Sequence, residues 1–222
     1  MTRAVFLDAL GTLVELEPPW VLLRERVPAE IGDERLVAAV REEMDYYKRH
    51  AHEGKDADSL ADLRRRCAKL LSDRLGAPVT VEELVDAVRM SAYPDAAPAL
   101  GSLRGRGVKL VVVSNWDCSL GSVLERCGLG DLIDGAVSSA EAGARKPDPR
   151  IFGPALALAD CEPAEALHVG DTPEEDVEGA RAAGIRALLI DRDETGRSSA
   201  SPAERPRIEG EISSLAEIEE HL

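Results

Sequence analysis

Short apolar runs alternate with helix-like segments over most of the chain outside residues 16–93. The runs lie at 5–7, 109–113, 135–139, 166–169 and 186–190. Continuous apolar runs of this length are typical of strands buried on both faces of a parallel sheet. Segments with apolar residues at helical spacing lie at 94–104, 119–127, 148–159 and 174–183. This alternation predicts an α/β fold: a Rossmann-like three-layer α/β/α core with a parallel sheet.

Residues 16–93 show helical periodicity and no strand-like alternation. Apolar residues recur every three or four positions in 33–53 and 58–75, and a capping box, Thr80 to Glu83, begins a third helix over 80–91. The pattern predicts a small, all-helical domain of about four helices. We therefore expect a core made of residues 1–15 and 94–222, with residues 16–93 inserted.

Three shorter segments complete the interpretation. Residues 14–19 are expected to form a turn or short flap, residues 192–207 a polar surface loop, and residues 214–221 a short amphipathic helix.

Composition narrows the range of partners. The 222 residues carry a net charge of −15, which disfavours nucleic acid and anionic membranes, since both attract basic surfaces. No apolar run approaches the length of a membrane span, and the N-terminus has no signal-peptide pattern, so we expect a cytoplasmic protein. The cysteines, Cys67, Cys118, Cys127 and Cys161, form no C-x-x-C pair and are predicted to be free thiols. The sequence does not distinguish a monomer from a homodimer.

Reactive side chains follow the predicted strands. Asp8 follows the first run, Ser114 and Asn115 follow the second, Lys146 lies in a loop after the third, and Asp171 follows the fourth. The carboxyl ends of parallel strands meet at one edge of a sheet, so these side chains are expected to converge in one crevice. Two carboxylates suit Mg²⁺, a hydroxyl and an ammonium suit phosphate oxygens, and a carboxylate can attack to form a covalent intermediate.

Four ordered segments resemble the motifs of the haloacid dehalogenase (HAD) superfamily. They are Asp8-Ala9-Leu10-Gly11-Thr12-Leu13, Ser114-Asn115, Lys146-Pro147-Asp148, and Gly170-Asp171 with Glu175-Asp176. The inserted helical segment resembles that superfamily's cap domain, and the similarity spans nearly the whole chain. Four motifs in the correct order are more specific than any one of them.

The resemblance implies a role for each matched residue. Asp8 would be the nucleophile and a ligand of Mg²⁺, and the backbone carbonyl of Leu10 would be another ligand. Ser114 and Lys146 would hold the phosphate, and Lys146 would also neutralise Asp8. Asp171 would complete the metal site.

Further residues are predicted to support the site. Glu175 or Asp176 would assist the metal site, and Asn115, Gly11 and Thr12 are candidates for contacting a small phosphorylated substrate. In the cap, Lys48, His50 and His52 belong to a basic and aromatic cluster that could contact the substrate, although a solvated helix end explains them equally well. His168 lies in an apolar strand and is predicted to be a packed core residue rather than a base.

Leu10 departs from the pattern of phosphatases in this superfamily, in which a second aspartate protonates the leaving group and then activates water. Leucine can do neither, and a positioned acid/base is commonly worth about 10²–10⁴-fold in rate. Leucine at this position is compatible with a phosphatase-type hydrolase whose substrate has a good leaving group, or whose acid/base comes from elsewhere, such as a cap histidine.

Leu10 is also compatible with three different functions. The first is C–halogen hydrolysis, because halide leaves without a proton and dehalogenases of the superfamily also lack the second aspartate. The second is phosphonate cleavage through a Schiff base on Lys48 or Lys55. The third is a non-catalytic module that binds a phosphate ligand. Because Asp171 and the acids beyond it are retained, we favour a Mg²⁺-dependent phosphatase-type hydrolase.

Overall fold

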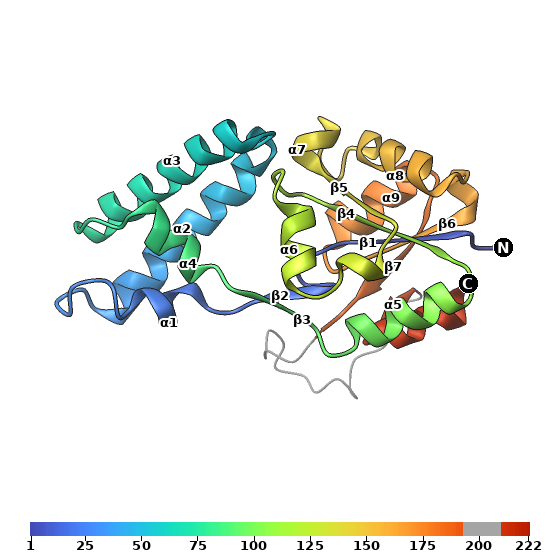
Figure 1. Ribbon diagram of the computed structural model, residues 1–222, viewed down its shortest axis with the longest axis horizontal. Helices are drawn as coiled ribbons and strands as arrows, with labels where there is room; N and C mark the ends of the chain where they lie inside the picture. Colours follow the sequence, from blue (N-terminus) through green and yellow to red (C-terminus); the bar gives the residue numbers. More distant parts are fainter. Residues whose placement is uncertain (193–209) are drawn as a thin grey trace.

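A six-stranded parallel sheet forms the centre of the larger of two lobes, with helices on both of its faces (Figure 1). The structure, a computed structural model, describes residues 1–192 and 210–222. The strands are β1 (Ala4–Leu7), β2 (Val14–Leu16), β3 (Met90–Ala92), β4 (Lys109–Ser114), β5 (Gly135–Ser138), β6 (Ala166–Gly170), β7 (Arg186–Ile190) and β8 (Glu211–Ile212). The sheet has the order β5-β4-β1-β6-β7-β8, and every neighbouring pair is parallel.

Helices connect these strands and build the smaller lobe. The α-helices are α1 (Pro19–Leu23), α2 (Asp33–His50), α3 (Ala57–Leu75), α4 (Val81–Ala87), α5 (Ala96–Gly105), α6 (Leu120–Arg126), α7 (Ser139–Ala142), α8 (Phe152–Ala159) and α9 (Gly179–Ala182). The 3₁₀ turns are η1 (Ala51–Glu53), η2 (Gly130–Leu132), η3 (Pro149–Ile151), η4 (Pro163–Glu165) and η6 (Leu215–His221), and η5 (Pro173–Glu178) is a π-helical turn. The predicted fold class is thereby confirmed.

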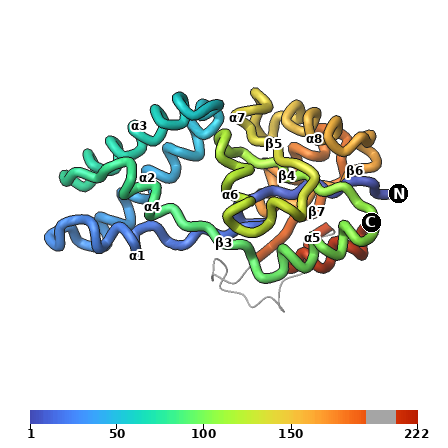
Figure 2. Tube along the Cα trace, viewed as in Figure 1, coloured from blue at the N-terminus to red at the C-terminus, as the bar shows by residue number. Residues whose placement is uncertain are grey.

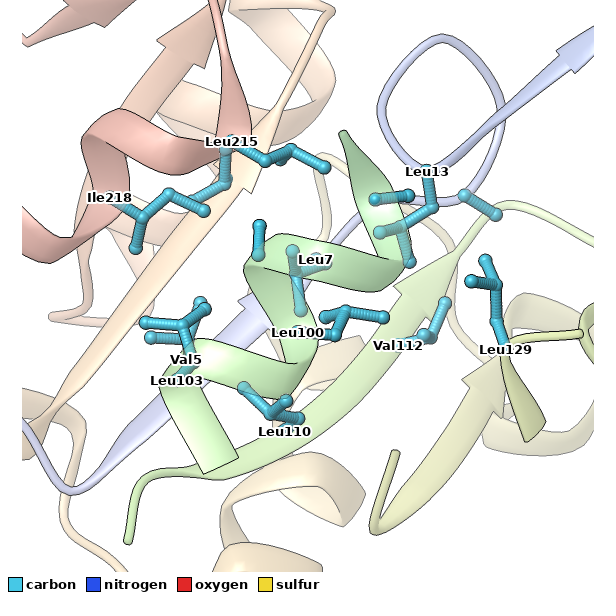
Figure 3. Packing of buried hydrophobic residues seen from close by; sticks show 14 of the residues in the cluster. Val5, Leu7, Leu13, Leu100, Leu103, Leu110, Val112, Leu129, Leu215 and Ile218 are labelled. Carbon is cyan, nitrogen blue, oxygen red and sulfur yellow. The ribbon is translucent and has the colours of Figure 1, made fainter. Parts of the chain in front are cut away.

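The apolar run of β1 is continuous because both faces of the strand are buried. Val5 and Leu7 pack into the cluster beneath α5, which Figure 3 shows from close by. Phe6 points to the opposite face, where it packs with Phe152 of α8. Successive side chains of a strand alternate between faces, so a strand between two helical layers needs apolar residues at every position.

Two short strands correct the expectation that helices alone occupy residues 16–93, and the first of them begins the segment 14–19, which is predicted to form a turn or short flap. β2 and β3 pair antiparallel, with Val14 opposite Ala92 and Leu16 opposite Met90. Helix α4 ends at Ala87 rather than continuing to residue 91, because the backbone is extended at Val88 and strand β3 begins at Met90. The two linking segments satisfy each other's backbone N–H and C=O groups, a long-range pairing that no local pattern reveals.

The smaller lobe, formed by α1 to α4, has an apolar cluster of its own. Buried side chains from Leu23 to Ala87 make up this cluster, in which α2 and α3 are the longest elements. The tube in Figure 2 shows the blue and green segments passing side by side between the lobes, where β2 pairs with β3. Of the predicted boundary residues, 16 is the last residue of β2 and 93 directly follows β3.

Several smaller predictions have clear outcomes. The predicted loop over 192–207 lies outside the described residues, except for Arg192. The predicted C-terminal helix is a 3₁₀ helix, η6, which follows the short strand β8. All four cysteines are free, with Cys67 buried and the others partly exposed. Within the described ranges, none of the helices combines the length and apolar character that crossing a membrane would require.

Candidate active site

Asp8 lies at the carboxyl end of β1, the edge of the sheet that points toward the helical lobe (Figure 1). Its backbone N–H donates to the carbonyl of Val169 in β6, 2.9 Å away, which anchors the residue beside that strand. On the other side, the Ser114 hydroxyl at the end of β4 donates to Asp8 Oδ1 over 2.9 Å. The parallel register of three strands therefore brings these residues together, as the sequence predicts.

Lys146 is buried against two carboxylates. Its Nζ lies 2.5 Å from Asp8 Oδ1 and 2.5 Å from Asp176 Oδ1, and only 1% of the residue is exposed. Burial acts to lower the pKa of Lys146, but the two adjacent carboxylates outweigh it and raise the pKa above its usual value. Lys146 is therefore an ammonium at neutral pH and neutralises part of the negative charge around it.

Three carboxylates form a group that could hold a metal ion. One oxygen from each of Asp8, Asp171 and Asp176 lies within 4.8 Å of the others. Gly11, at φ +85°, allows the first motif to pass close to this group, because a Cβ there would lie 2.2 Å from Asp171 Oδ2. Clustered carboxylate oxygens are the donors that Mg²⁺ prefers.

The electrostatics of the group support a cation at this position. Burial raises the pKa of Asp8, with Lys146 acting against the shift and Asp176 adding to it. Burial and the repulsion from Asp8 and Asp176 raise the pKa of Asp171 to about 6. Burial also acts to raise the pKa of Asp176, but Lys146 and His168 outweigh it and hold that pKa well below its usual range. A divalent cation would offset the remaining repulsion, so the residues present fit Mg²⁺.

Asn115 and Glu175 hold the loop that carries Lys146. Asn115 accepts a bond from the backbone N–H of Lys146 over 2.8 Å and donates to the carbonyl of the same residue over 3.0 Å. Asn115 also donates to Glu175 Oε2 over 2.9 Å, and Arg145 lies 3.2 Å from Glu175 Oε1. The group of three carboxylates contains Asp176 and not Glu175. The geometry therefore favours Asp176 of the two acids proposed to support the metal.

The remaining residues of the first motif pack into the protein. The half-buried side chain of Leu10 packs against the apolar cluster beneath α5. Thr12 is fully buried, and its carbonyl accepts two bonds from the Arg192 guanidinium, at 3.0 and 2.6 Å. Its hydroxyl has no hydrogen-bond partner in the part of the chain that the structure describes. Whether Gly11 and Thr12 contact a substrate stays a prediction.

The structure ties His50 to its own domain. His50 Nδ1 lies 2.8 Å from Glu53 Oε1, and the ring lies against that of Tyr46, with the centroids 4.2 Å apart. Arg66 completes this network by binding Glu53 over 2.5 Å. A role of His50 in binding substrate stays a prediction.

Sequence reasoning missed two buried contacts near the site. Tyr47 Oη of α2 donates to Asp117 Oδ2 over 2.7 Å, and Asp117 is 2% exposed. This bond links the two lobes, and Asp117 lies only three residues after Ser114 in the sequence. The second contact joins His168 Nε2 to Asp176 Oδ1 over 3.0 Å. Asp117 follows Asn115 closely enough to have been a candidate, whereas no local signal connects His168 to Asp176.

Comparison with known proteins adds sequence evidence. A family model described as haloacid dehalogenase-like hydrolase matches residues 2–184. The chain is 43% identical over 117 residues to haloacid dehalogenase-like hydrolase domain-containing protein 3 of Bos taurus, covering 51% of this chain and 47% of that protein. It is 39% identical over 128 residues to phosphoserine phosphatase of Thermus thermophilus, covering 55% and 51%. The chain thus spans about half the length of these curated relatives.

Similarity to solved structures extends over the whole chain. The crystal structure of L-2-haloacid dehalogenase from Xanthobacter autotrophicus matches with a TM-score of 0.69 and 22% identity, covering 98% of this chain and 97% of that one. At this identity the match shows the shared fold, a parallel α/β sheet with an accompanying helical region.

Proposed function

Since this chain belongs to the haloacid dehalogenase-like hydrolase family, we propose that it is a Mg²⁺-dependent phosphatase-type hydrolase acting on a small phosphorylated molecule through Asp8. The observation that carries the proposal is the position of the buried Asp8 carboxylate. It contacts both the Ser114 hydroxyl and the Lys146 ammonium, and it lies beside Asp171 and Asp176. Phosphatases among the relatives support the same reaction class.

The geometry suggests which oxygen of Asp8 reacts. Within the described residues, Ser114 and Lys146 both donate to Oδ1, which leaves Oδ2 available to attack phosphorus. Attack forms an aspartyl phosphate as the bond to the leaving oxygen breaks. Water then attacks the phosphorus, the bond between phosphorus and the Asp8 oxygen breaks, and inorganic phosphate leaves with both protons of the water, which restores the Asp8 carboxylate. Ser114 and Lys146 both bind Oδ1, and these two bonds fix the orientation of the Asp8 carboxylate before attack.

Charge stabilisation comes from the groups around Asp8. Lys146 is positioned to stabilise negative charge that develops on the phosphoryl oxygens, in a buried site where such contacts are strong. Asp8, Asp171 and the Leu10 carbonyl would hold Mg²⁺, with Asp176 in support. When bound, the ion would supply further neutralisation of the phosphoryl charge.

Leu10 restricts the kind of substrate. The side chain has no proton to give to a leaving oxygen, so the reaction suits substrates whose leaving group departs as a stable anion. Acyl phosphates and activated aryl phosphates have this property. We therefore propose a phosphorylated small molecule of this kind rather than an ordinary alkyl phosphate.

A second candidate is hydrolysis of a 2-haloacid, which Leu10 specifically favours. Halide leaves without protonation, so the reaction needs no acid at position 10. The cluster of three carboxylates formed by Asp8, Asp171 and Asp176 argues against this candidate, since displacement of halide requires no metal site.

One comparison separates the candidates. Turnover of acetyl phosphate, an activated aryl phosphate and a 2-haloacid is measured with Mg²⁺ and with a chelator. We expect phosphate release that requires Mg²⁺ and is lost in Asp8→Asn, with the fold of the variant checked by circular dichroism. Halide release that the chelator leaves unchanged would instead establish the dehalogenase. Phosphate binding without turnover of any substrate would indicate a binding module.

A further inference from the structure

His168 belongs both to the core of the larger lobe and to the site. It lies in β6, two residues before Gly170, and is 0% exposed. Its ring meets the ring of Phe152 edge-on, with the centroids 5.0 Å apart, which is a core contact. Its Nε2, however, lies 3.0 Å from Asp176 Oδ1. A single buried imidazole therefore connects the apolar layer under α8 with the cluster of three carboxylates, through Asp176.

The surroundings of the ring define which nitrogen carries the proton. A hydrogen bond from Nε2 to a carboxylate oxygen requires the proton on Nε2, because the carboxylate can only accept. Nδ1 is buried and has no hydrogen-bond partner among the described residues. A proton on Nδ1 would be a buried donor without an acceptor, which is costly. The geometry thus assigns the neutral tautomer with hydrogen on Nε2.

Asp176 is held by donors on both of its oxygens. Oδ1 accepts from His168 Nε2 and from Lys146 Nζ, and Oδ2 accepts from the backbone N–H of Thr172 over 3.0 Å. The backbone of Gly170 also lies against this carboxylate, since a Cβ there would come within 2.1 Å of Asp176 Cγ. The carboxylate therefore has one orientation, and His168 supplies one of the bonds that fix it.

The bonds continue from Asp176 to the nucleophile. Lys146 Nζ bridges Asp176 Oδ1 and Asp8 Oδ1, with both distances at 2.5 Å. Four side chains in series, His168, Asp176, Lys146 and Asp8, thus run from the core to the reacting carboxylate. Removing His168 would let the Asp176 carboxylate rotate, and the Lys146 ammonium would then move away from Asp8.

We propose that His168 is a positioning residue that orients Asp176, and through it Lys146, toward Asp8. The proposal rests on the proposed function for the identity of the reacting group, but the bonds it concerns can be observed without turnover. A neutral donor suits this position, because it fixes the carboxylate without adding a second cation that would compete with Lys146.

The test compares two substitutions. His168→Leu fills part of the same space and removes the donor, whereas His168→Gln retains an N–H near the position of Nε2. Losing a hydrogen-bond partner one step away from the reacting groups typically costs about 10–100-fold in activity or metal affinity. We expect this loss in kcat, with a smaller change in KM, for His168→Leu, and substantial recovery in His168→Gln.

Two readouts separate positioning from packing. ¹⁵N NMR of the wild-type imidazole should show hydrogen on Nε2 and a bare Nδ1, and calorimetric titration with Mg²⁺ should show weaker binding in His168→Leu than in His168→Gln. Leu167→Val is the matched control, because Leu167 is a buried neighbour on the opposite face of β6 and its shortening affects packing alone.

The outcomes are distinct. Hydrogen on Nδ1, or equal kcat and equal Mg²⁺ affinity in the two His168 variants, would overturn the proposal. Failure of the proposed function would appear differently, as absence of Mg²⁺-dependent phosphate release in the wild-type protein. The NMR and Mg²⁺ titrations would still report on His168 in that case.

Discussion

Leu10 is the residue whose side chain most directly limits the proposed reaction. It lies two positions after Asp8, and its half-buried side chain packs against the apolar cluster beneath α5. By the resemblance to HAD phosphatases, an acid introduced here would supply the missing proton transfer. The same change would place a polar group beside apolar neighbours, so the new carboxylate must turn away from the cluster.

Leu10→Asp is expected to raise kcat/KM for an unactivated alkyl phosphate by roughly 10–100-fold, the lower part of the range for a positioned acid/base. Leu10→Asn is the control, since the asparagine side chain has the same shape as that of aspartate but cannot act as an acid. The kcat/KM for acetyl phosphate should change much less, because its leaving group needs no acid and this ratio does not include the later hydrolysis of the aspartyl phosphate. Equal rates in the Asp and Asn variants would show that position 10 does not face the leaving group.

Asp171 makes a second prediction at this scale, concerning pH. Its pKa is raised to about 6 by burial and by the nearby Asp8 and Asp176 carboxylates. Asp171 therefore still binds a proton at pH values at which an ordinary aspartate has already released it. Metal binding requires the ionised carboxylate, so the proton competes with Mg²⁺ below that pH.

Apparent Mg²⁺ affinity should therefore fall as the pH drops below about 6, approaching a tenfold loss for each further pH unit. Isothermal titration calorimetry at several pH values measures the affinity, and buffers of different ionisation enthalpy report the proton released. Asp171→Asn should bind Mg²⁺ more weakly and lose the part of the pH dependence that is centred near pH 6. An affinity that stays constant from pH 7 to about pH 5 would exclude Asp171 as a ligand.

At the scale of single elements, helix α2 carries an acid into the core of the helical lobe. Glu43 is buried where α2 packs against α3, and it is hydrogen bonded to Cys67. Burial raises the pKa of Glu43 above its usual value of 4.5, with the Cys67 thiol acting against the shift. The folded protein therefore keeps this proton over a pH range in which the unfolded chain has already released it.

The sign of the effect follows from proton linkage. Stability falls with rising pH wherever the folded state binds more protons than the unfolded state. Glu43 therefore lowers the free energy of unfolding as the pH rises above 4.5 toward its raised pKa. Glu43→Gln should remove this loss, giving a gain on the order of 1 kcal/mol at neutral pH that disappears near pH 4.

Urea unfolding at several pH values measures this difference. Asp45→Asn, an exposed position on the same helix, is the control for simple loss of charge. A gain for Glu43→Gln that does not vary with pH would mean that titration of Glu43 is not its source.

The whole molecule carries a net charge of −15, whereas the proposed substrate is an anion. Within the described site, Lys146 is buried between two carboxylates that offset its charge. The long-range field around the protein therefore follows the negative net charge and repels the anionic substrate. Salt screens such repulsion over distances beyond about 10 Å at 0.1 M ionic strength.

Raising the ionic strength from about 0.02 M to about 0.2 M should therefore increase kcat/KM, by roughly two- to fivefold, because association is hindered less. The rate at saturating substrate should stay nearly constant, since it does not include association. Steady-state kinetics at fixed free Mg²⁺ measure both quantities. A fall in kcat/KM with salt would point to a basic entrance to the site instead.

The sequence by itself determined the fold class and most of the candidate site. Continuous apolar runs predict buried parallel strands, and a parallel sheet brings the residues after each strand to one edge. Asp8 and Ser114 could therefore be placed together from the pattern alone, because their proximity follows from strand pairing. Lys146 and Asp171 belong to the same prediction through the order of the motifs.

Only the tertiary structure decided which neighbouring acid joins the carboxylate group and what holds it there. Glu175 and Asp176 are adjacent in the sequence, but η5 directs Asp176 to Lys146 and Glu175 to Asn115. The bond from His168 to Asp176 and the pairing of β2 with β3 were equally invisible. Each depends on side-chain direction or on contact between distant segments, and residue type and spacing specify neither.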